Sequence, residues 1–158
     1  AGAVVGIFQD TIDKIVLLAM FLPVLAGQSG NTGAQALAVL IREMTLGELG
    51  PRVKNQLIKE AILGVVHGFI VGCICAVVMY VIASSQNNPH VITLSLIILF
   101  SMTVSCLVSG LMGAFVPVVL KKFGADPAAG SSIILTTGTD VVSMGVMLFL
   151  ANKFILGN

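Results

Sequence analysis

Tryptophan is absent from this sequence of 158 residues, tyrosine occurs once, and only 9% of the residues are charged, with a formal net charge of +1. A nucleic-acid partner calls for a basic run with interleaved aromatic residues, and the chain has no such run. A soluble domain of this length has too small an interior to hide so apolar a chain. The scarcity of charge therefore argues against both classes of protein.

Cysteine is scarce as well, and Cys73, Cys75 and Cys106 all lie within apolar stretches. Cys73 and Cys75 are two positions apart and so point to different faces of a helix, which favours reduced, buried thiols over a disulfide or a metal-binding pair. Without thiolate pairs or clustered imidazoles, the chain offers no site that suits a soft metal.

Apolar residues dominate what is present: they make up 57% of the chain, and the mean hydropathy is +1.08. Spanning a hydrocarbon core of about 30 Å takes about 20 helical residues, and stretches of that length without alternation satisfy their backbone as helices. The sequence predicts an all-α integral membrane protein, a bundle of four complete transmembrane helices preceded by the tail of another helix or an interfacial arm at residues 1–8. The four spans are expected at residues 12–41, 61–83, 91–120 and 128–152.

The distribution of lysine and arginine predicts the orientation, because short cytoplasmic loops carry the excess of these residues. Lys14, Lys153 and the uncharged loop at residues 84–90 fall on one side of the predicted bundle. Six of the eight basic residues fall on the other, so we expect the two basic links in the cytoplasm and the C-terminus outside, in the cell (plasma or inner) membrane. These six are Arg42, Arg52, Lys54 and Lys59 in the first link, and Lys121 and Lys122 in the second.

Small residues recur at every fourth position in two of the spans, a spacing that lets another helix approach closely in a bilayer. We interpret both stripes as packing surfaces. Pro23 and Pro117 lie inside predicted spans, where each removes a backbone donor and is expected to kink its helix. The lone His67 is interpreted as a packed or hydrogen-bonded histidine. The two stripes are Gly64, Gly68, Gly72 and Ala76, and Ser101, Ser105, Ser109 and Gly113.

The first span becomes polar over residues 27–35, and in lipid each unpaired polar group of such a run costs several kcal/mol. This segment must therefore face protein or water. Gly27, Gly30 and Gly33 leave one helix face bare, while Asn31 and Gln35 stand four apart and are expected to project together. The glycines do not predict a phosphate-binding loop, because no strand precedes them and the loop lysine is missing.

The last span contains two acidic residues with different expected roles. Asp126 precedes Pro127 and is typical of a helix N-cap, with a secondary ion site as the alternative. Asp140 lies near the middle of the span, where a carboxylate costs at least about 2.5 kcal/mol and marks an ion or proton path, although a protonated Asp bonded to neighbouring hydroxyls is the structural alternative.

One carboxylate among hydroxyls, amides and carbonyls makes an all-oxygen site, which favours magnesium, calcium or manganese. Magnesium keeps its waters and is often held through one or two carboxylates, which suits so sparse a site. Because one Asp140 cannot balance two positive charges, we expect a symmetric dimer that brings two of them together.

These motifs resemble the transmembrane domain of the MgtE magnesium transporter/channel family over nearly the whole chain. The resemblance rests on Pro23 followed by Gly-Gln-Ser-Gly-Asn-Thr-Gly-Ala-Gln at residues 27–35, on Gly-Ala-Asp-Pro at 124–127 and on Thr-Thr-Gly-Thr-Asp at 136–140. It implies a homodimer with its pore at the subunit interface, passive conduction of hydrated Mg²⁺ and no organic cofactor. It also implies that Asp140 binds the hydrated ion and that Thr136 offers a backbone carbonyl. The pore-lining residues would be Gly27, Gly30, Asn31, Gly33, Gln35, Thr137 and Ser143.

Family members have five transmembrane helices and N-terminal cytoplasmic regulatory domains with CBS modules that close the pore at high magnesium. Here residues 1–158 correspond to the membrane domain alone, with residues 1–8 as the tail of the first helix, so we expect an isolated or truncated membrane domain.

Two alternatives to passive conduction stay open at this stage. One is a proton- or sodium-coupled cation exchanger, in which paired Asp140 carboxylates share a proton because like charges raise one pKa. The other is a non-conducting membrane assembly subunit that recruits partner helices through its glycine stripes. An enzyme is the least supported class, since the sequence has no nucleophile–base pair, no Gly-x-Ser-x-Gly motif and no metal-ligand histidine pair.

Overall fold

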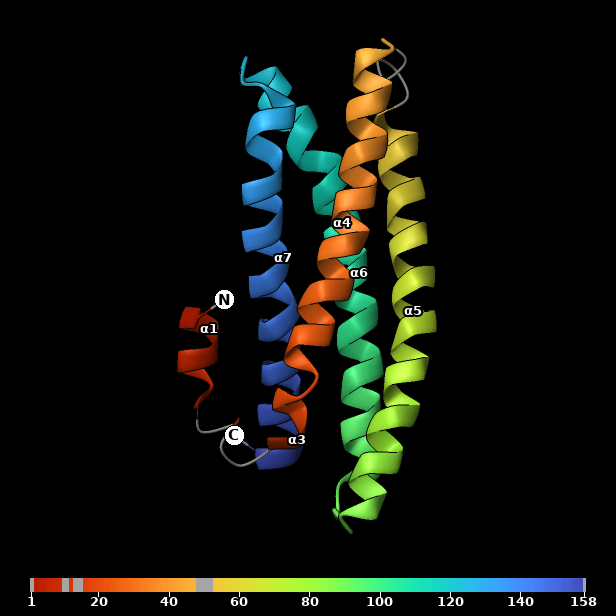
Figure 1. The fold of residues 1–158 in the computed structure, drawn as a ribbon, viewed down its shortest axis with the longest axis vertical. Coiled ribbons are helices and arrows are strands. Elements are labelled where there is room, and N and C mark those ends of the chain that lie inside the picture. Colours follow the sequence, from red (N-terminus) through yellow and green to blue (C-terminus); the bar gives the residue numbers. More distant parts are fainter. Residues whose placement is uncertain (1, 10–11, 13–15, 48–52, 158) are drawn as a thin grey trace.

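The computed structural model describes residues 2–9, 12, 16–47 and 53–157, and within them every regular element is a helix (Figure 1). Lys14 and Arg52, which contributed to the predicted orientation, lie outside the described residues. The elements are α1 (Gly2–Ile7), α3 (Val16–Ala19), α4 (Leu22–Thr45), α5 (Val53–Ser85), α6 (Val91–Lys122), α7 (Pro127–Ala151) and the π-helix η2 (Asn152–Leu156).

Helix α6 is the centre of the bundle and packs against α4, α5 and α7, while α4 and α5 hardly touch each other. Successive long helices run in opposite directions (Figure 1). The end of α4 and the start of α5 therefore lie at the same end of the bundle as the end of α6 and the start of α7, at the top of the figure. The two links expected to carry the excess of basic residues thus share one end of the bundle.

Three of the described helices are long and apolar enough to cross a membrane: residues Val53–Ser85, Val91–Lys122 and Gly130–Leu156. Helix α4, with 24 residues, also has the length for a crossing, about 36 Å, but its polar middle lowers its hydropathy. The predicted spans at 91–120 and 128–152 match α6 and α7 closely. Helix α5 begins at Val53 instead of residue 61, because its first turns are helical but polar.

The first predicted span is interrupted. A turn at Met20 and Phe21 separates α3 from α4, and Pro23 falls in the first turn of α4. The break lies where a kink was predicted at Pro23, and the first turn of α4 tolerates the proline because it lacks only an N–H that has no partner there. Pro117 does lie inside α6 as predicted.

The glycine stripe of α5 is confirmed as a packing surface against α6. A Cβ atom added to Gly64 would lie 2.5 Å from the carbonyl oxygen of Cys106, and one added to Gly68 would lie 2.8 Å from that of Met102. The serine stripe of α6 approaches α4 in the same way, where a Cβ on Gly113 would collide with the backbone of Gly33. The fourth predicted member of the α5 stripe, Ala76, is only partly buried, and the neighbouring Cys75 takes the buried position.

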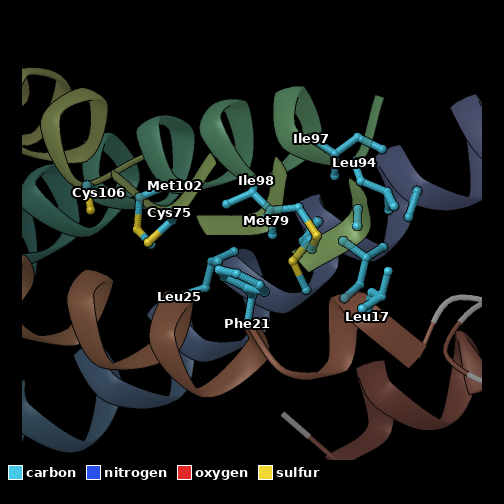
Figure 2. Close-up of a cluster of buried hydrophobic side chains, with 14 residues drawn as sticks. Leu17, Phe21, Leu25, Cys75, Met79, Leu94, Ile97, Ile98, Met102 and Cys106 are labelled. Atoms are coloured by element: carbon cyan, nitrogen blue, oxygen red, sulfur yellow. The ribbon is translucent and has the colours of Figure 1, made fainter. Parts of the chain in front are cut away.

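The larger of two hydrophobic core clusters lies at the other end of the bundle from the basic links, and a smaller one of Leu40, Met44 and Ala114 lies near those links. Figure 2 shows Phe21 and Leu25 of the α3–α4 region meeting Met79 of α5 and Ile98 and Met102 of α6. Outside this cluster, α5 presents a broad exposed apolar surface. Such a surface is expected of a helix that faces lipid.

Candidate functional site

The polar run of residues 27–35 is helical throughout and lies in α4. Its side chains divide between two faces: Ser29, Thr32 and Gly33 are buried, whereas Gly27 and Asn31 are exposed. No atom comes within 4 Å of a Cβ added to Gly27 or Gly30. The outward face of α4 is therefore both polar and free of side-chain bulk.

A buried set of hydroxyl groups joins the three helices α4, α6 and α7. Ser29 Oγ lies 2.7 Å from Ser143 Oγ, Ser143 Oγ donates to the carbonyl oxygen of Thr139 at 2.6 Å, and Ser109 Oγ of α6 donates to the carbonyl oxygen of Ser29. Ser143, which was expected to line a pore, is fully buried in this network. Its contacts fix the position of α7 against α4.

The direction of Asp140 follows from its neighbours on α7. The side chain of Met112 of α6 occupies the space beside Gly138, and residues two apart on a helix differ by about 200° in direction. Asp140 therefore faces away from α6. Ser143 lies about 60° from Asp140 around the helix and contacts α4, so the half-buried Asp140 borders the outer edge of the α4–α7 contact.

Thr136 and Thr137 are exposed and lie one turn before Asp140. The side chain of Thr136 donates to the carbonyl oxygen of Ser132 at 2.8 Å. Its own carbonyl oxygen accepts from Thr139 Oγ1 at 3.1 Å and also faces the amide of Asp140 in the helical pattern. Because a carbonyl oxygen has two lone pairs, this predicted ion contact is already engaged in the described structure.

The two flanks of α4 face different partners. Thr32 and Gln35 line an open cavity of about 260 Å³ together with residues of α5. Gly30 is two positions before Thr32 and so points the opposite way, toward the flank of α7. Gly27, Gly30 and Asn31 lie on the outward side of α4, and Gln35, about 40° from Asn31 around the helix, borders the cavity beside α5. Gly33 lies in neither place, because it packs against Ser109 and Leu135.

Asp126 is the N-cap of α7, as predicted, and accepts a hydrogen bond from the amide of Ala128 at 2.9 Å. It lines a separate cavity of about 210 Å³ at the basic end, together with Lys121 and the end of α4. Along the axis of α7 it is about 21 Å from Asp140. Asp126 and Asp140 therefore do not belong to one site.

The outward side of α4 and the half-buried Asp140 of α7 offer oxygen donors with one carboxylate. Within the described ranges no group of three or more His, Cys, Asp or Glu residues is positioned to hold a metal ion. The described part of one copy therefore offers no cage of such side chains for a dehydrated metal. A cation that keeps its water shell needs only outer contacts of the kind that Asp140, Asn31 and the hydroxyls offer.

Sequence reasoning missed the structural role of Ser29 and Thr139. Ser29 stood within the polar run, but a buried serine and an exposed one look alike in sequence. The only available signal was the four-residue spacing of Ser105, Ser109 and Gly113, which indicates that another helix lies close to this face of α6.

Comparison with known proteins identifies the family of the chain. The sequence profile of the MgtE divalent cation transporter family matches residues 22–150. The chain is 28% identical over 156 residues to a magnesium transporter MgtE of Bacillus subtilis, covering 98% of this chain and 33% of that protein. It is 27% identical over 154 residues to the MgtE of Enterococcus faecalis, with 97% and 33% covered, and 29% identical over 146 residues to that of Thermus thermophilus, with 91% and 31% covered. The chain spans about a third of the length of these relatives. By the extent of the family match, it belongs to the MgtE family of divalent cation transporters.

Proposed function

We propose that two copies of this chain form a pore for hydrated Mg²⁺ at their interface, with Asp140 of each copy facing the ion. The observation that carries the proposal is the outward position of Asp140 beside the bare, polar face of α4. In one copy this face has no covering element within the described residues. A second copy placed against it would enclose a water-filled path between two such faces.

Energetics favour covering this face over leaving it to lipid. A carboxylate near the middle of a membrane costs at least about 2.5 kcal/mol, and exposed amide and hydroxyl groups add to that cost. In a two-fold symmetric dimer, one interface shields the polar faces of both copies from lipid. It also supplies two carboxylates for one divalent ion. The buried Ser29–Ser143 contact would keep the α4 and α7 sides of each half in register.

The relatives are named as magnesium transporters, which supports magnesium as the ion. They are about three times as long as this chain, so regulation by additional cytoplasmic domains belongs to the proposal for the full-length protein. We place the two basic links in the cytoplasm and the C-terminus outside, as the positive-inside rule predicts. Conduction would be passive, down the electrochemical gradient.

The test is Mg²⁺ uptake into proteoliposomes that contain the chain, with wild type, Asp140→Asn and Asp140→Ala compared and with Ca²⁺ and Mn²⁺ as competitors. Glu43→Gln, which removes a carboxylate near the end of α4, is the matched control. We expect Glu43→Gln to conduct and both Asp140 variants to lose Mg²⁺ flux or selectivity by at least about tenfold, the equivalent of about 1.4 kcal/mol.

Other outcomes would decide among the alternatives. Equal flux through wild type and Asp140→Asn would refute the ion site. Flux driven by a pH gradient without a magnesium gradient would indicate coupled exchange. A cysteine at position 31 that does not cross-link two copies under oxidising conditions would contradict the placement of the dimer interface at the outer face of α4.

A further inference from the structure

A second polar cavity lies between α4 and α5, on the flank of α4 that faces away from Asp140. Its volume is about 260 Å³. By the share of about 30 Å³ that each water occupies in the liquid, it has room for about eight or nine water molecules. The polar and charged residues that line it are Thr32 and Gln35 of α4 and Lys59, Glu60 and His67 of α5.

Glu60 is unusual among the residues of this cavity because it is an acidic side chain in a buried position. It is only 7% exposed, and its Oε1 accepts a hydrogen bond from Gln56 Nε2 at 2.9 Å. Within the part of the chain that the structure describes, Glu60 forms no salt bridge, and the hydrogen bond from Gln56 engages only one of its two oxygens. Lys59 acts on Glu60 without a direct ion pair, and a buried carboxylate without such a pair is costly, so the cavity suits a positively charged hydrogen-bond donor.

Two further side chains in the cavity limit which class of molecule can carry this positively charged donor. Lys59, next to Glu60, is exposed and lines the same cavity. The Nε2 atom of His67, deeper in the cavity, is buried and has no hydrogen-bond partner. One positive and one negative side chain give a balanced lining. A free anion would be repelled by Glu60, and a divalent cation would find a single carboxylate beside a lysine.

The depth of the cavity points to a lipid. Helix α5 has 33 residues and is about 50 Å long, which exceeds a hydrocarbon core of about 30 Å. Its charged residues all lie at or before Glu60, while the stretch from 61 to 85 is uncharged. The boundary between headgroups and hydrocarbon therefore falls near Lys59 and Glu60.

The cavity is also flanked by apolar side chains suited to acyl chains. Leu63 and Val39 line it and are 50% and 38% exposed. A molecule whose polar end fills the cavity could pass its hydrocarbon chains over these residues into the bilayer.

We propose that this cavity binds the headgroup of phosphatidylethanolamine. Its ammonium group donates hydrogen bonds to the carboxylate of Glu60, and its phosphate faces the ammonium of Lys59. The headgroup, with about eight non-hydrogen atoms, matches the size of the cavity. The site is separate from the proposed ion path and does not depend on it.

The test measures the unfolding midpoint of the purified chain in detergent while lipids of identical acyl chains are titrated. The probes are phosphatidylethanolamine, its mono-, di- and trimethylated forms, and phosphatidylglycerol. Methylation removes the N–H donors one at a time and keeps the charge. Because hydrogen bonds to charged groups contribute about 1.5–3 kcal/mol, we expect at least about tenfold tighter binding of phosphatidylethanolamine than of the trimethylated form, phosphatidylcholine.

Substitutions then separate the two contacts. Glu60→Gln keeps an oxygen for Gln56 and is expected to bring the preference for phosphatidylethanolamine over phosphatidylcholine to about one. Lys59→Met should weaken both lipids alike, since both carry the phosphate. Lys54→Met, an exposed lysine of the same helix that does not line the cavity, should leave both affinities unchanged.

Equal binding across the methylation series would overturn the proposal even if the Glu60 variant failed to fold, because that series uses the wild-type chain. Stabilisation by Mg²⁺ alone, lost in Glu60→Gln, would assign the cavity to a cation instead. Displacement of the lipid by free phosphoethanolamine at equal concentration would also contradict it, since the acyl chains would then contribute nothing.

Discussion

Replacing Gly64 by alanine tests the close approach of α5 and α6 most directly. The new Cβ would lie 2.5 Å from the carbonyl oxygen of Cys106, whereas ordinary contacts begin at 3.4 Å, so the space is short by about 0.9 Å (3.4 minus 2.5). The next atoms, the carbonyl carbon of Cys106 and the Cα of Leu107, are also backbone. No side chain can rotate away, so the helices must separate.

The appropriate reference for this change is Gly27→Ala, because both substitutions gain the same helix propensity and no atom lies within 4 Å of a Cβ at Gly27. Relative to Gly27→Ala, we expect Gly64→Ala to lower the free energy of unfolding by about 1–3 kcal/mol, the usual cost of overpacking. The assay is thermal unfolding followed with a thiol-reactive dye, since Cys106 is fully buried and becomes reactive when α5 leaves α6. Equal unfolding midpoints for the two variants would refute the packing argument.

Three further predictions concern the site and its support. Changing Ser29 and Ser143 to alanine singly and together should give a coupling free energy of about 0.5–1.5 kcal/mol in a double-mutant cycle, and additive effects would show that their 2.7 Å contact contributes nothing. The variant Gly30→Val has open space around its Cβ and should fold with an unchanged unfolding midpoint. Its side chain would narrow the proposed path, so we expect a large loss of Mg²⁺ uptake in proteoliposomes. Normal uptake would place the path elsewhere. Asp126→Ala removes the N-cap of α7 and should lower stability by about 0.5–2 kcal/mol, whereas Asp126→Ser should restore most of it, as measured by thermal unfolding.

The sequence predicted helix positions best where apolar runs end at strong turn signals. The predicted starts of α6 and α7, at residues 91 and 128, lie within about one residue of the observed ones, and Asp126-Pro127 was recognised as a helix start. The start of α5 was missed because hydropathy reports the apolar length of a helix and not its full length. The break before α4 lies where Pro23 was expected to kink its span, but the sequence did not predict that the helix would begin again with the proline in its first turn.

Side-chain direction was harder to predict than helix position. Helix α5 is apolar on nearly all sides, so its buried face could be inferred only from the spacing of Gly64, Gly68 and Gly72. In the polar run, Asn31 and Gln35 were expected to project together. Both are exposed on α4 and lie about 40° apart around it, and Gln35 also borders the cavity beside α5. Which flank meets which helix depends on tertiary packing that no local pattern records.

The pairing of α5 with α6 also has a consequence for biosynthesis. Only residues 86–90 connect these two helices, and their contact continues from Gly64 near one end to Met79 and Ala83 near the other. Contacts so close in sequence form quickly, so we expect the two helices to enter the membrane together as a hairpin. Helix α4 is synthesised earlier, so we expect it to remain unpaired in the bilayer until the serine stripe of α6 is inserted. Helix α7 would pack last, against the surface formed by α4, α5 and α6.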